Sequence, residues 1–103
     1  MLFCFILISN AIKYNKSKTI EIEIGYNLLS NEHLFYVKDN GIGIKEDDQH
    51  RIFEPKFTTK NSGMGLGLSI IKNIIENYKG SITFETQFGQ GTTFTVRLPI
   101  LNS

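Results

Sequence analysis

The sequence predicts an α+β fold, a two-layer α/β sandwich in which a mixed, mostly antiparallel sheet carries helices on one face. Three observations predict it. Several short stretches alternate apolar and polar residues, as half-buried strands do. One longer stretch repeats its apolar residues at helical spacing. The chain has 103 residues, enough for one small domain with a single core, so the strands and helices share that core as two layers.

The first strands are predicted as an antiparallel hairpin. Residues 18–26 place apolar side chains on one face and glutamates on the other: Ile20, Ile22, Ile24 and Tyr26 against Glu21 and Glu23. Residues 30–32 form a polar turn, and residues 34–38 form the second strand. That strand runs into Asp39-Asn40-Gly41, a strong turn signal.

A short helix is expected within residues 45–53, followed by a loop over residues 54–64. The main helix is marked by apolar residues at i, i+1, i+4, i+5 and i+8: Ile70, Ile71, Ile74, Ile75 and Tyr78. Lys79 in the last turn and Gly80 just beyond it are a stop signal.

The last two strands follow the main helix. Ile82 and Phe84 mark the third strand, and residues 88–91 turn the chain. The fourth strand alternates Phe94, Val96 and Leu98 and ends at Pro99. The order of elements completes one sheet with helices between its hairpins.

The first element is ambiguous. Residues 2–8 are wholly apolar, but the run is too short to span a bilayer and lacks the flanks of a signal peptide. We therefore expect a buried element and no direct membrane insertion. Ile8, Ala11 and Ile12 have helical spacing, whereas the β-branched and aromatic content favours a strand, so both alternatives stay open.

The composition excludes several functions. The net charge is +1 with both signs interleaved, unlike the basic stripe of a nucleic-acid-binding protein. Cys4 is the only cysteine, so neither an internal disulfide nor a thiolate metal cluster can form within one chain. This is compatible with a reducing compartment, and we expect a cytoplasmic location.

Two glycine-rich segments, residues 39–44 and 63–68, could bring backbone close to a ligand. The second opens directly into the main helix, and a helix N-terminus binds phosphate readily. Either segment alone is more often a simple glycine turn. Neither matches a P-loop or a dinucleotide fingerprint.

Polar residues near these segments could contact a ligand. Asp39 is either a turn former or an acceptor for a ligand amine. If the first element is a helix, Asn10, Lys13 and Tyr14 share a face. An amide oxygen can ligate Mg²⁺ and an ammonium can meet a phosphate, although such residues in isolation are most often simply solvated.

Taken together, five segments in order resemble the catalytic domain of sensor histidine kinases. They match that family's N box, first glycine box, F box, second glycine box and final Gly-Thr motif, at residues 9–14, 39–44, 52–55, 63–68 and 91–94. The resemblance covers nearly the whole chain. Residues 53–60 are most similar to kinases with a short lid, such as those of the nitrogen-regulation type. It implies a Bergerat ATP-binding fold and ATP with Mg²⁺ as ligands.

The resemblance also implies roles for residues at the adenine end. Asp39 would accept from the adenine amine, and Gly43 would hold the adenine edge through its backbone and a water. Tyr14 would pack near the base, and Thr93 would support Asp39 and that water. The rest of the first glycine box, implied to line the site, is Gly41, Ile42 and Ile44.

At the phosphate end, Asn10 would ligate Mg²⁺ and Lys13 would reach phosphate or ribose. The lid would include Thr58, Thr59 and Lys60, with Lys60 near the phosphates. The second glycine box would close the lid and offer N–H groups to phosphate: Gly63, Met64, Gly65, Leu66, Gly67 and Leu68. Phe53 would lie where the domain meets its histidine-bearing partner.

The resemblance implies that the γ-phosphate goes to a histidine on a separate dimerisation domain and then to a response regulator. His33 and His50 do not match the phosphoacceptor motif, a histidine followed by an acidic residue on a long helix. We therefore expect both to be surface residues, and expect the chain alone to lack a phosphoacceptor.

Two features depart from the family pattern. Ile6 stands where the family usually has an asparagine, one helical turn before Asn10. The family's usual first strand and helix have no counterpart in residues 1–103. The alternatives are a non-catalytic ATP-binding remnant and, less favoured, a gyrase-like ATPase or an anti-sigma serine kinase. These last two need a glutamate base at the position of Ile6, and an apolar side chain cannot accept a proton.

Overall fold

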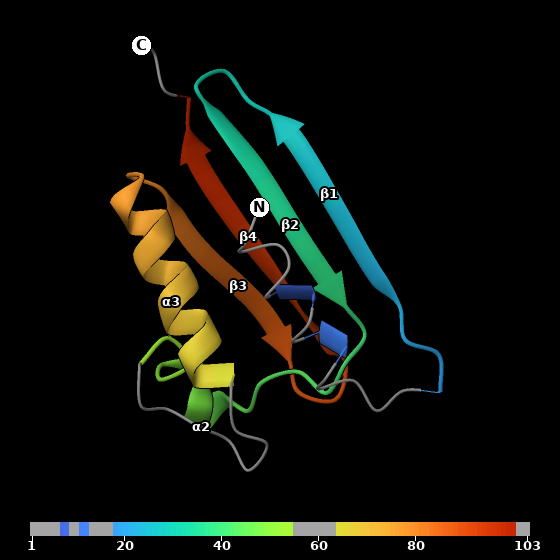
Figure 1. Ribbon diagram of the computed structural model, residues 1–103. Coiled ribbons are helices and arrows are strands. Elements are labelled where there is room, and N and C mark those ends of the chain that lie inside the picture. Colours follow the sequence, from blue (N-terminus) through green and yellow to red (C-terminus); the bar gives the residue numbers. More distant parts are fainter. Residues whose placement is uncertain (1–6, 9–10, 13–17, 55–63, 101–103) are drawn as a thin grey trace.

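The computed structural model describes residues 7–8, 11–12, 18–54 and 64–100 (Figure 1). Its sheet has four strands in the order β1-β2-β4-β3. The strands are β1 (Ile22–Leu28), β2 (Glu32–Asp39), β3 (Ser81–Gln87) and β4 (Gly91–Pro99). The predicted α+β fold is confirmed. Every strand pair is antiparallel, so no parallel pair of the expected mixed sheet occurs among the described strands.

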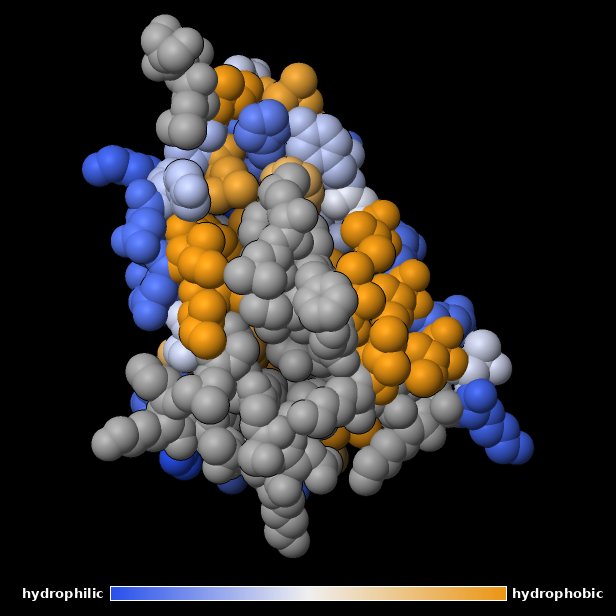
Figure 2. Space-filling model, viewed as in Figure 1, coloured by the Kyte–Doolittle hydropathy of each residue, from blue (hydrophilic) through white to orange (hydrophobic). Residues whose placement is uncertain are grey.

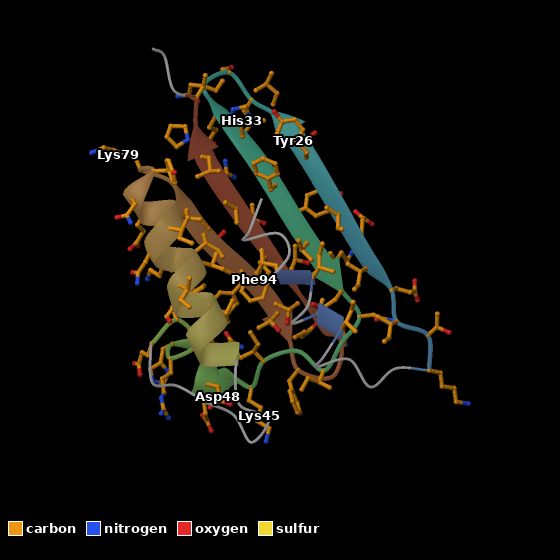
Figure 3. All side chains as sticks on the ribbon, viewed as in Figure 1. Tyr26, His33, Lys45, Asp48, Lys79 and Phe94 are labelled. Atoms are coloured by element: carbon orange, nitrogen blue, oxygen red, sulfur yellow. The ribbon has the colours of Figure 1, made fainter. Side chains whose placement is uncertain are left out.

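The helical layer lies over one side of the sheet. Helix α3 (Met64–Asn77) packs along β3, and the one-turn helix α2 (Glu46–Gln49) lies near the N-terminal end of α3 (Figure 1). Phe94 points from β4 into the layer between the sheet and α3 (Figure 3). The buried cluster consists of Leu7, Val37, Ile44, Ile52, Leu68, Ile71, Ile75, Ile82, Phe94 and Val96.

The ambiguous first element is helical where it is described. Residues 7–8 and 11–12 have helical conformation, and Leu7 and Ala11 are buried, at 2% and 6% exposure. These residues are therefore helical and not extended, because helical spacing places their apolar side chains on the shared core. No helix among the described residues is long and apolar enough to cross a bilayer.

Helix α3 ends at Asn77, close to the predicted stop, and the two residues of the stop signal follow it and have different tasks. Lys79 takes the left-handed conformation, with φ of 65°. A Cβ at Gly80 would lie 2.4 Å from the Arg97 carbonyl oxygen of β4. Gly80 is therefore required for the close approach of the chain to β4, while the positive φ that commonly selects glycine falls on a lysine.

Strand β1 departs most from expectation. Ile22 packs against the core, but Ile24, Tyr26 and Leu28 are 56%, 50% and 63% exposed. We call these three residues the apolar edge. They alternate as predicted, but α3 lies over the opposite edge of the sheet and leaves them uncovered. Figure 2 shows apolar side chains at the surface over β1.

Candidate functional site

Asp39 ends β2 and faces the core side of the sheet. It pairs with Thr92 of β4, and the Gly41 N–H donates to Asp39 Oδ1 at 2.8 Å. Partial burial raises the pKa of the Asp39 carboxyl, and backbone N–H groups of Gly41 and Thr92 oppose that shift. The carboxylate is therefore fixed in direction and incompletely solvated, which suits it to accept a further N–H donor.

Two threonines continue this row across the sheet. Thr92 pairs with Asp39 on one side and with Thr86 of β3 on the other. Thr86 Oγ1 lies 2.8 Å from Thr92 Oγ1, 3.0 Å from the Gly91 carbonyl oxygen and 2.9 Å from the Ile44 nitrogen. If Thr86 donates to Gly91, it accepts from Ile44 N–H and Thr92 O–H, which uses its full hydrogen-bonding capacity.

The first glycine segment is bound to the turn between β3 and β4. Gly43 has φ of 74°, and a Cβ there would lie 2.3 Å from the Gln87 carbonyl oxygen. The Gly89 N–H donates to the Ile42 carbonyl at 2.6 Å. Ile44 contributes its backbone N–H to Thr86, while its own side chain is buried in the core. The loop thus presents backbone beside Asp39.

Gly91 brings β4 against the end of β2. Its φ is 133°, and a Cβ would lie 2.0 Å from the Asp39 carbonyl oxygen. Only glycine tolerates both that dihedral and that approach. The same residue that starts β4 therefore sets the position of the Asp39 backbone.

The geometry does not bring Thr93 to Asp39. Thr93 pairs with Lys38 and lies on the far face of the sheet, because neighbouring strand residues point to opposite faces. Thr92 occupies the place that the sequence interpretation gave to Thr93. The alternation along the two strands indicates this arrangement. Thr92 lies on the same face of β4 as buried Phe94, and Thr86 lies on the same face of β3 as Ile82 and Phe84.

Asn40 links the site to β1. Its Oδ1 accepts from the Glu21 N–H at 2.9 Å, and its Nδ2 donates to the Thr19 carbonyl at 2.9 Å. The side chain thereby continues the hydrogen bonding between β1 and β2 beyond the end of β2.

The predicted phosphate and partner residues are placed only in part. Gly65, Leu66 and Gly67 lie in the first turn of α3, which begins at Met64, so backbone N–H groups at this end lack partners within the helix. Leu68 is fully buried and serves the core.

Phe53 packs against Phe84, with ring centroids 6.0 Å apart, and beneath the Lys72 ammonium at 5.2 Å. Its role at a partner interface stays a prediction. The described part of the chain holds no group of three His, Cys, Asp or Glu side chains able to bind a metal. Ile6 lies outside the described residues. The same is true of several residues predicted for the site: Asn10, Lys13, Tyr14, Thr58, Thr59, Lys60 and Gly63.

The family follows from comparison with known proteins. The family described as histidine kinase-, DNA gyrase B-, and HSP90-like ATPase matches residues 3–102. The chain belongs to this ATPase family. Within it, the chain corresponds to the ATP-binding catalytic domain of two-component sensor histidine kinases.

Individual relatives agree with the family. A sensor-like histidine kinase, SenX3 of Mycolicibacterium smegmatis, is 39% identical over 90% of this chain and 26% of its own length. Cyanobacterial phytochrome A of Nostoc is 43% identical over 91% of this chain and 13% of its own length. The solved catalytic domain of histidine kinase ThkA superimposes with a TM-score of 0.81 at 34% identity, covering 94% of this chain and 64% of that one. The chain thus spans about an eighth to a quarter of these two curated relatives.

Proposed function

We propose that this ATPase-family domain binds Mg-ATP and donates the γ-phosphate to a histidine on a separate dimerisation domain, which passes it to a response regulator. The observation that carries the proposal is the Asp39 carboxylate, held by backbone N–H groups at the end of β2 and flanked by the row of Thr92 and Thr86. A fixed, partly desolvated carboxylate favours a ligand that offers an N–H donor, as the adenine amine does.

The described residues fit the adenine end of such a ligand. Gly91 lets β4 approach the Asp39 carbonyl, and Gly43 lets its loop approach the Gln87 carbonyl, so no side chain stands at either point. The N-terminal turn of α3 supplies backbone N–H groups of the kind that bind phosphate. We assign Mg²⁺ to Asn10, phosphate contacts to Lys13 and Lys60, and a cytoplasmic location, all as parts of the proposal.

A thermal scan with nucleotides tests the ligand. A ligand that binds only the folded state stabilises it by about 2.7 kcal/mol at a hundredfold excess over Kd. For a domain of this size, that raises Tm by roughly 10–20 °C. We expect this shift with Mg-ADP and much less with Mg-GDP, because guanine presents a carbonyl where adenine presents its amine.

The matched control compares two carboxylates. Asp39→Asn should remove most of the Mg-ADP shift, because the charge-assisted hydrogen bond, about 1.5–3 kcal/mol, is lost. Asp47→Asn, at an exposed carboxylate on α2, should leave it intact. Equal shifts with ADP and GDP would contradict adenine recognition by Asp39, and the absence of any shift would contradict nucleotide binding.

Phosphotransfer is tested separately. Incubation with radiolabelled ATP should leave the chain alone unlabelled and should label a histidine-bearing helical domain added in trans. Acid-labile label on His33 or His50 of this chain would contradict the need for a separate phosphoacceptor.

A further inference from the structure

The loop that follows Asn40 is held along its length by the end of the β3–β4 hairpin. The Ile44 N–H donates to Thr86 Oγ1 at 2.9 Å. The Gly89 N–H donates to the Ile42 carbonyl at 2.6 Å. A Cβ on the loop residue between them, Gly43, would lie 2.3 Å from a backbone carbonyl oxygen at the end of β3. Three consecutive loop residues therefore each contact the hairpin.

The next residue, Lys45, extends this row of contacts to the surface. Its ammonium nitrogen lies 5.5 Å from the centroid of the Phe88 ring, within the range of a cation–π contact. Both side chains are exposed, Phe88 at 57%. Three acidic residues follow Lys45, yet no carboxylate within the described part of the chain forms an ion pair with it. The ring is therefore the partner of this ammonium among the described residues.

Holding this loop matters for a ligand that binds beside Asp39. The loop contains Gly41 and Gly43, and Gly43 has φ of 74°, so the loop's own backbone restricts its conformation little. The apparent Kd of a ligand rises as the fraction of protein in the binding-competent conformation falls. Contacts that keep the loop in one conformation therefore strengthen binding even when they do not touch the ligand.

We propose that Phe88 and Lys45 are positioning residues for nucleotide binding. The ring and the ammonium hold residues 41–45 against the β3–β4 turn, in the conformation that receives adenine. This inference rests on the proposed function, because the loop has this role only if the domain binds an adenine nucleotide. Both side chains act through the loop backbone, so their loss should weaken contacts at the adenine end and leave the phosphate end unchanged.

Calorimetric titration with Mg-ADP tests the pair. Phe88→Leu keeps an apolar side chain without a ring and should weaken binding about two- to fivefold, the range of an exposed cation–π contact. Lys45→Gln should weaken it by the same factor. The double variant should be no weaker than either single variant, because the two residues share one contact. Phe88→Tyr and Lys45→Arg keep the ring and the charge, so both should bind as the wild type does.

The matched control is Lys79→Gln, at an exposed lysine that lies at the opposite end of the molecule from Lys45 (Figure 3). It should bind Mg-ADP as the wild type does. Phosphotransfer to a histidine-bearing helical domain in trans gives a second readout. Phe88→Leu should raise KM for ATP and leave kcat unchanged, because the phosphate end keeps its contacts.

Amide hydrogen exchange in the nucleotide-free chain tests the loop itself. Phe88→Leu should speed exchange about two- to fivefold at the amides of Ile44 and Gly89, because each bonds the loop to the hairpin. The amide of Val37, in the interior of β2, should exchange at the wild-type rate.

Unchanged exchange at both loop amides, unchanged Mg-ADP affinity in Phe88→Leu, or additive losses in the double variant would overturn the proposal. A wild type without measurable Mg-ADP binding would contradict the proposed function, and with it this role in binding. The exchange measurement needs no nucleotide, so it distinguishes a failure of the loop contact from a failure of nucleotide binding.

Discussion

The two edges of the sheet differ in what covers them. On the β3 side, α3 buries Ile71 and Ile75 completely against the sheet, and polar side chains such as Thr86 are fully bonded. On the β1 side, the same alternation of apolar residues continues, yet Ile24 and Tyr26 are half exposed. Apolar character alone therefore does not predict burial, because burial needs a second layer above the residue.

The largest expected difference between the two edges concerns core packing. Ile75→Ala should cost about 2–5 kcal/mol, because it leaves a cavity beneath α3. Ile24→Ala, the same change at a half-exposed site, should cost less than about 1 kcal/mol. Urea unfolding of dilute, monomeric samples measures both. Similar costs at the two positions would mean that β1 is covered in solution.

Glycine replacements sharpen the comparison. Gly91→Ala should cost about 2–3 kcal/mol, because its positive φ and the contact with the Asp39 carbonyl admit no side chain. Gly25→Ala also meets a neighbour, but that neighbour is the outer end of the Tyr36 side chain, which can move aside. We expect a change within about 1 kcal/mol. Chemical denaturation of each variant, with the Mg-ADP shift as a second readout, distinguishes a clash with fixed backbone from a clash with a side chain that can move.

Removing a side-chain hydroxyl should also cost more free energy of unfolding on the covered side of the sheet than on the open side. Thr86→Val should cost about 1–3 kcal/mol and weaken Mg-ADP binding, because it leaves the Ile44 N–H without its acceptor. Thr86→Ser keeps the hydroxyl and should restore nucleotide affinity. On the open side, Tyr36→Phe removes a solvent-exposed bond to Glu23 and should leave the unfolding midpoint unchanged. Calorimetric titration that found Thr86→Val equal to wild type would remove Thr86 from the site.

The smallest effect concerns pH. Burial raises the pKa of the Asp39 carboxyl, so its stabilising contribution is full below the unfolded pKa of about 3.9 and is lost as pH rises through the higher folded-state pKa. Asp39→Asn has no charge to desolvate. In the absence of nucleotide it should therefore be more stable than the wild type at pH 7, with the difference shrinking toward pH 4. Urea midpoints measured across this range give the sign directly.

Much of the fold was predictable because its signals are local. The alternation in β1 to β4, the apolar stripe of α3 and the turn at Asp39 each lie within a few residues of sequence. Asp39 itself stands out as a carboxylate directly followed by small residues at the end of a strand. These features need no knowledge of the partner strand.

Other features depend on distant pairing. Thr86 meets the Ile44 N–H across 42 positions of sequence, and the choice of Thr92 over Thr93 depends on which face β4 turns to the core. The local pattern shows which residues of one strand share a face, but it does not show which residues of another strand lie beside them. Likewise, nothing within residues 22–28 reveals that α3 stops short of them. The exposure of β1 follows from where α3 lies, which only the whole fold determines.

Asp39 and Asn40 are adjacent in sequence but have separate roles. Asp39 carries the proposed adenine contact, whereas Asn40 bonds the chain to Glu21 and Thr19. In a lineage that ceased to use nucleotide, drift could therefore erase the first residue while selection for folding retained the second. Comparing how these two positions vary among descendant genes would therefore show which lineages still select for nucleotide binding and which select only for folding.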